Sequence, residues 1–123
     1  MILFKAKNML KVGIIRCALV AEICPATSCI KAVKESKGAF KDLECELIGF
    51  MTCGGCPGLK VSANVRTLLN RGAEVIALSS CMTRGYPVGS KAFTCPHFED
   101  IKKAVESVLK KDAPEVKLLE WTH

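Results

Sequence analysis

Four short apolar runs with strand character alternate along the chain with stretches of helical period. They cover residues 11–16, 44–51, 73–79 and 115–121. The first run is continuous and rich in Val and Ile, which is typical of a strand buried on both faces of a parallel sheet. The last run alternates apolar and polar side chains and is predicted to be an edge strand. The pattern therefore predicts four strands.

The stretches between these runs carry helix signals. Apolar side chains recur at three- and four-residue spacing over residues 29–35, 59–70 and 95–111. Thr27 or Ser28 is expected to cap the first helix. Pro57 is expected in the first turn of the second helix, where its missing N–H has no cost, and Gly72 is expected to end that helix. Loops are predicted over residues 18–26 and 82–94.

The alternation of strands and helices predicts one α/β domain over residues 11–123. A strand–helix–strand order favours a parallel sheet with right-handed crossovers. We expect a small doubly wound sheet, flavodoxin-like or Rossmann-like, with four strands in the order 2-1-3-4 and helices on both faces. Residues 1–10 precede this pattern and are expected to form a disordered N-terminal extension.

Composition and charge argue against two classes of partner. Half of the 123 residues are apolar and 24% are charged, as in ordinary globular proteins, and no apolar run reaches the ~18 residues of a membrane-spanning helix. Lys5 and Lys7 interrupt the N-terminal apolar segment, so no signal peptide is predicted. The net charge of +6 comes largely from lysines on predicted helix faces, without interleaved aromatic residues. We therefore expect neither a nucleic acid nor a membrane as partner.

Eight cysteines are the unusual feature of the composition. Without a secretory signal they indicate a protein of the reducing cytoplasm, where thiols act as metal ligands or redox groups. Because the carboxyl ends of parallel strands meet at one edge, residues that follow the strands should converge in a crevice between strands one and three. These residues are Cys17 after strand one, Cys53 and Cys56 after strand two, Cys81, Cys95 and His97 after strand three, and His123 after strand four.

The remaining cysteines fit this convergence less well. Cys24 lies in the first loop, and it joins His123 as an outer candidate for the site. Cys45 begins the second strand at the opposite edge of the sheet and is expected to be a small buried apolar residue. Cys29 lies in the first turn of a helix, where the pattern favours neither the crevice nor the core.

The sequence Cys53-Gly54-Gly55-Cys56 has the spacing of several kinds of thiol site. Such pairs bind zinc or iron–sulfur clusters, or act as a dithiol. The helix predicted to follow would favour thiolates through its positive end. Soft ligands argue against magnesium and calcium. Because the candidates outnumber the ligands of one zinc ion, a two-metal site, an iron–sulfur cluster, or a metal beside a reactive thiol all remain open.

Three other chemistries lack their motifs. A phosphatase-type loop needs Arg six residues after a cysteine, and the positions after Cys17, Cys53 and Cys81 hold other residues. No G-x-G-x-x-G follows the first strand, and no G-x-S-x-G nucleophile elbow occurs. Dinucleotide binding of the usual kind and hydrolase chemistry of these types are therefore not expected.

Beyond its single motifs, the chain from Lys11 to His123 resembles the CGGC domain proteins of archaea and anaerobic bacteria. The resemblance implies a metal-binding domain, with zinc as the expected metal and no assigned reaction. Cys45 and the first ten residues lie outside its pattern. The matching pieces are Ile15-Arg16-Cys17, Cys24-Pro25, Gly38-Ala39-Phe40, Gly49-Phe50, Thr52-Cys53-Gly54-Gly55-Cys56-Pro57-Gly58, Ser80-Cys81, Arg84-Gly85, Cys95-Pro96-His97 and Thr122-His123.

Two functional hypotheses follow, with a third that is weaker. The first is a metal-binding domain with zinc, slightly preferred, or an iron–sulfur cluster. Its ligands would be Cys53 and Cys56 completed from Cys17, Cys81, Cys95 and His97, with Cys24 and His123 as outer candidates. The second is a thiol-disulfide or small-molecule reductase, in which Cys53 attacks and Cys56, Cys17 or Cys81 resolves. The third is a carrier that hands electrons or metal to a protein partner.

Overall fold

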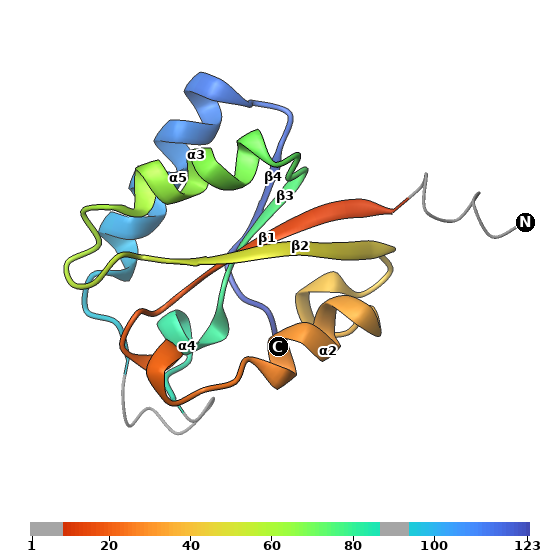
Figure 1. Cartoon of the computed structure of the whole chain (residues 1–123), viewed down its shortest axis with the longest axis horizontal. Coiled ribbons are helices and arrows are strands. Elements are labelled where there is room, and N and C mark those ends of the chain that lie inside the picture. The colour runs from red at the N-terminus through yellow and green to blue at the C-terminus, as the bar shows by residue number, and fades with distance from the viewer. Residues whose placement is uncertain (1–8, 87–93) are drawn as a thin grey trace, which may run out of the picture.

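The computed structural model describes residues 9–86 and 94–123 as a parallel sheet covered by helices on both faces (Figure 1). The sheet has four strands in the order β2-β1-β3-β4, and all three neighbouring pairs are parallel. This result confirms the doubly wound α/β fold and its strand order. The strands are β1 (Leu10–Arg16), β2 (Cys45–Thr52), β3 (Val75–Leu78) and β4 (Lys117–Leu119). Of the predicted N-terminal extension, residues 1–8 lie outside the described residues.

Two helices cover each side of the sheet. In Figure 1, α3 (Val61–Asn70) and α5 (Phe98–Asp112) lie above the sheet, and α2 (Thr27–Lys34) and the short α4 (Ser80–Thr83) lie below it. Two 3-10 turns, η1 (Val20–Glu22) and η2 (Gly38–Phe40), complete the connections.

The central strands divide the core between the two faces. Alternate side chains of a strand point to opposite faces of its sheet. Ile15 and Ile76 pack with α3 and α5, whereas Val12 and Ile14 pack with α2 and Phe40. These β1 and β3 side chains are fully or almost fully buried. The apolar runs thus supply a core on each face, and the carboxyl edge of the sheet is left to the loops.

Two helix starts differ from the prediction. The residue before α2 is Ala26, whose φ of 64° is left-handed, and Thr27 already belongs to the helix, so neither Thr27 nor Ser28 caps it. Helix α3 begins at Val61, so Pro57 lies in the preceding loop and not in the first helical turn. Three glycines between β2 and α3 have positive φ, which a right-handed helix excludes. The thiols of the CGGC motif therefore do not sit at a helix N-terminus.

The region after β3 also differs from a simple loop. Cys81 lies in α4, which covers the first part of the predicted loop at residues 82–94. Residues 87–93 of that loop lie outside the described residues. Cys95 and His97 precede α5, close to the predicted start of that helix.

Gly13 lets helix α3 approach the middle of the sheet. A Cβ atom at this position would lie 2.8 Å from Leu68 Cδ1, 3.0 Å from its Cδ2 and 3.1 Å from its Cγ. The same leucine would be 3.4 Å from a Cβ at Gly49, which is ordinary contact. One of these atoms would clash and two more would be in tight contact, so the buried Leu68 side chain would have to shift.

We predict that Gly13→Ala lowers the free energy of unfolding by about 1–3 kcal/mol through overpacking, as measured by urea denaturation. Gly49→Ala is the matched control, since it adds the same methyl group on the neighbouring strand, and its effect should be clearly smaller. Equal losses in the two variants would contradict the argument from the contact with Leu68.

Candidate functional site

The end of β1 fixes the segments that carry the candidate residues. Arg16 O accepts a hydrogen bond from the N–H of Cys53 at 3.0 Å, and Ile15 O accepts one from the N–H of Ser79 at 2.9 Å. The sheet ladders on both sides of β1 thus continue past the last residues of β2 and β3. As a result, Cys17, Cys53 and the start of α4 lie side by side at the carboxyl edge of the sheet.

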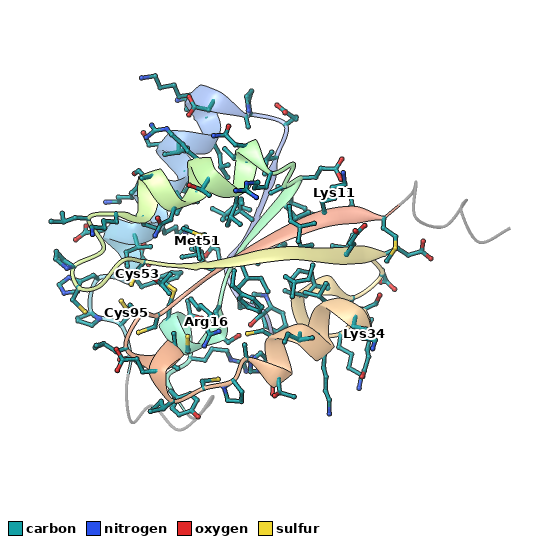
Figure 2. The ribbon with its side chains drawn as sticks, in the orientation of Figure 1. Lys11, Arg16, Lys34, Met51, Cys53 and Cys95 are labelled. Atoms are coloured by element: carbon teal, nitrogen blue, oxygen red, sulfur yellow. The ribbon has the colours of Figure 1, made fainter. Side chains whose placement is uncertain are left out.

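A cavity of about 160 Å³ lies at this edge between the CGGC loop and the segment before α5. We call it the thiol cavity. Figure 2 shows Cys53 and Cys95 close together there, from the segment after β2 and the segment before α5. Five of the six principal candidates line it: Cys17, Cys53, Cys56, Cys95 and His97, together with Pro57, Met82, Pro96 and Ile101.

The CGGC loop is held by short hydrogen bonds and by glycine. Thr52 anchors it, because its Oγ1 accepts from the N–H of Gly54 at 3.0 Å and its carbonyl accepts from Asn64 Nδ2 at 2.6 Å. At Gly58, φ is 96° and a Cβ would lie 2.7 Å from Ile101 Cγ1 on α5. Only glycine lets this turn pack against α5, which closes the thiol cavity from one side.

The four thiols differ in exposure. Cys17 and Cys53 are buried, Cys95 is half-buried and Cys56 is exposed. Burial raises the pKa of the Cys95 thiol, the backbone N–H of His97 opposes that rise, and the nearby sulfurs of Cys17, Cys53 and Cys56 add to it. Forming several thiolates here is therefore unfavourable unless a cation compensates them, and binding a cation would release protons.

Cys81 faces a second, larger cavity of about 370 Å³ on the other side of the β1 end. We call it the arginine cavity. It contains the outer candidates Cys24 and His123, and also Cys29. The predicted single crevice is therefore two hollows. The side chains and backbone that line the arginine cavity belong to Arg16, Val20, Cys24, Pro25, Ala26, Thr27, Ser28, Cys29, Ser79, Cys81, Tyr86 and His123.

A buried polar cluster joins the thiols of the arginine cavity. Ser79 Oγ lies 3.3 Å from Cys29 Sγ and 3.5 Å from Cys81 Sγ, and Thr122 Oγ1 lies 3.4 Å from Cys29 Sγ. Burial raises the pKa of Cys81, while Ser79 and the backbone N–H of Cys17 stabilise its thiolate. Cys17 and Cys81 are thus neighbours whose side chains line different cavities.

The role of Cys29 could not be read from its position in the sequence. Its neighbours in this cluster are Ser79, which follows β3, and Thr122 near the end of the chain, so only the folded structure brings them together. Arg16 was likewise not a candidate, although it directly precedes Cys17 and lines the arginine cavity.

The thiols that line the thiol cavity are not drawn together on one point in this structure. Within residues 9–86 and 94–123, no group of three or more His, Cys, Asp or Glu side chains is arranged to hold one metal ion. Tetrahedral zinc draws each of its sulfur ligands to about 2.3 Å, which leaves no room for a cavity between them. The residues Cys17, Cys53, Cys56 and Cys95 instead line a space of about 160 Å³, which is well above the ~10–15 Å³ that one water molecule needs in a cavity.

A comparison against known families gives one match that covers most of the chain. A model of the CGGC domain matches residues 11–123, which is nearly the whole chain. The protein belongs to the CGGC domain family. This CGGC domain is also 42% identical, over 79 residues, to an uncharacterized protein of Methanocaldococcus jannaschii. That match covers 58% of this chain and 62% of the relative. No solved structure matches the chain.

No helix in the described part of the chain is both long and apolar enough to cross a membrane.

Cys45 lies at the opposite edge of the sheet, where the sequence placed it. It is the first residue of β2 and only 4% exposed, within the core on the α2 side. Burial raises the pKa of its thiol, and the charge of Lys117 only partly offsets that effect. The folded state therefore favours the neutral thiol more strongly than the unfolded chain does.

We predict that Cys45 makes the protein less stable at alkaline pH. Its contribution is fully present below the ordinary thiol pKa of about 8.5 and is lost as the pH rises through the higher folded-state pKa. Denaturation of the wild type and Cys45→Ala should be compared between about pH 8 and about pH 10.5. The wild type should lose more stability over this range, and identical pH dependence would show that this thiol does not contribute.

Proposed function

We propose that this CGGC domain holds an iron–sulfur cluster in the thiol cavity, with Cys17, Cys53, Cys56 and Cys95 as ligands. The observation that carries the proposal is that these four cysteines line one space of about 160 Å³. Four cysteines are the usual ligand set of such clusters. The sequence slightly preferred zinc, and we place the cluster first because four cysteines line a cavity of this size.

The residues that line the thiol cavity fit an iron–sulfur cluster in the chemistry of their ligand atoms as well as in the number of cysteines. The donors are soft sulfurs, which select iron–sulfur clusters, zinc or copper(I) over magnesium and calcium. The other lining side chains are mainly apolar, including Met82 and Ile101, and they limit the access of water. When bound, the cluster would supply one-electron transfer. His97, at the start of α5, lies beside the thiols as a neighbour that can tune them by hydrogen bonding.

Several features of the chain would serve such a centre. The loop around Gly58 holds Cys53 and Cys56 against α5, and the ladder hydrogen bond to Arg16 O fixes Cys53. Cys56 is exposed, so it gives the centre one side toward solvent and toward an electron-transfer partner. Ligation by free thiols also implies a reducing compartment, so we propose that the protein works in the cytoplasm.

A second candidate function is thiol–disulfide exchange by the Cys53 and Cys56 pair. The observation that favours it is their unequal exposure, because Cys56 is exposed while Cys53 is only 4% exposed. Attack on a substrate would then start from Cys56, with Cys53 as the resolving thiol, which is the reverse of the order expected from the sequence. The pair alone does not account for Cys17 and Cys95 in the same cavity.

Anaerobic purification followed by elemental analysis and a visible spectrum separates these functions. The cluster predicts a brown protein with visible absorption and with iron and acid-labile sulfide in equal amounts. A colourless protein with about one zinc per chain would show that the site binds zinc and not a cluster. A metal-free protein in which Cys53 and Cys56 form a disulfide on mild oxidation would favour the reductase.

We predict that Cys53→Ser reduces metal content by about tenfold or more, because losing a direct ligand should cost at least as much as losing a residue that orients one. Cys45→Ser is the matched control, since both residues are 4% exposed and only Cys53 lines the cavity. Metal analysis and circular dichroism should show loss of metal in the first variant alone, with helical content kept in both. Equal loss of metal in the two variants would contradict direct ligation by Cys53.

A further inference from the structure

The arginine cavity is a separate hollow that the proposed metal centre does not use. Its volume of about 370 Å³ lies within the range of small-molecule pockets. Its wall at Cys81 adjoins Cys17 of the thiol cavity, so only one layer of side chains lies between the two spaces. A molecule bound there would therefore lie next to the thiol cavity without entering it.

Arg16 is held in a fixed position in the wall of this cavity. Its Nη2 donates to the carbonyl of Cys24 at 2.6 Å and to that of Ala21 at 3.4 Å. The guanidinium carbon also lies 5.3 Å from the centre of the Phe50 ring, in cation–π geometry. Figure 2 shows Arg16 beneath the sheet, on the side of α2 and α4. These contacts use one nitrogen and one face of the guanidinium group and orient the rest of it.

The charge of Arg16 has no carboxylate partner in this part of the molecule. None of the described residues that line the cavity is Asp or Glu. The salt bridges among the described residues pair Lys37, Arg66 and Lys102 with acidic groups elsewhere. A half-buried guanidinium without an acidic neighbour is poorly compensated, because its interaction with water is reduced and neutral acceptors replace it only in part. This combination favours an anionic ligand.

Neutral donors surround the same space. The hydroxyl groups of Thr27, Ser28 and Tyr86 belong to residues that line it. The cavity also contains the first residues of α2, where Ala26 offers no capping side chain to the first backbone N–H groups. Burial and the charge of Arg84 lower the pKa of His123, so that imidazole is neutral near pH 7. Arg16 is thus the positively charged side chain among the described residues that line this cavity.

We propose that the arginine cavity binds a small oxyanionic ligand, carrying a carboxylate or phosphate group that pairs with Arg16. A planar guanidinium matches either group through parallel N–H donors. The thiols of Cys24 and Cys81 line the same space and are within reach of the remainder of the ligand. The proposal goes beyond metal binding and does not depend on it.

Calorimetric titration of the full chain at constant ionic strength tests the proposal, with inorganic phosphate in one arm and propionate in the other. We expect one anion to bind and thereby identify the class. Arg16→Gln should weaken its binding by about tenfold or more, as expected for loss of a charged hydrogen-bond partner. Arg71→Gln, which removes an exposed arginine at the end of α3, is the control and should change binding by less than about twofold. The proposal would be overturned if neither phosphate nor propionate bound, or if the two variants weakened binding equally.

Because Arg16 also holds the segment around Cys24, a second measurement uses the unchanged protein. The rate at which iodoacetamide modifies Cys24 should fall several-fold in the presence of the binding anion, relative to chloride at the same ionic strength. The rate at Cys45, a thiol that lines neither cavity, should stay the same. No protection of Cys24 by either anion, or the same change at both thiols, would overturn the proposal.

Metal content measured on the same samples keeps the two proposals apart. Arg16→Gln should retain its metal, and Cys53→Ser should retain anion binding. A metal-free protein that still binds the anion through Arg16 would disprove the cluster and leave the arginine cavity intact.

Discussion

The site depends on one constraint, the hydrogen bonding of β1 to parallel strands on both of its sides. The ladders continue beyond the strands, so that Arg16 O receives Cys53 and Ile15 O receives Ser79. A parallel ladder places the carboxyl ends of its strands together, and the chain leaves each strand at the same edge. Thiols separated by dozens of residues in the sequence therefore meet over the end of one strand. No disulfide or bound group has to gather them.

Close packing around this edge then separates the thiols into two environments. On the α5 side, the glycine turn at Gly58 rests on Ile101 and leaves a small space bounded by sulfur and carbon. On the α2 side, Arg16 and the polar cluster around Ser79 leave a larger space with a positive charge. The β1 end lies between them, with Cys17 on one side and Cys81 on the other. The proposed metal centre, which needs thiolates, and the proposed anion, which needs a cation, would thus occupy two adjoining but separate cavities.

The division into two cavities gives the thiols and Arg16 different chemical environments. Soft sulfurs in an apolar space suit a metal centre, because thiolates form there only with a compensating cation. A fixed guanidinium without a carboxylate partner suits an oxyanion, because the bound ligand would supply the missing charge. If both spaces are filled, the ligand lies within a side chain's thickness of the centre.

The sequence alone determined the strands, their order and the meeting of cysteines at one edge, because apolar periodicity and the rules of parallel sheets are local or topological. It also placed Cys45 correctly at the far edge, since the first residue of a strand cannot lie at its carboxyl end. Tertiary structure alone decided that Cys81 lines the arginine cavity with Cys29 and does not line the thiol cavity. The direction of that side chain follows from the short helix α4 and from packing against Ser79, and no pattern of residues encodes either. The start of α3 was likewise decided in three dimensions, because left-handed glycines fit the loop against a residue of α5 that lies more than forty positions away.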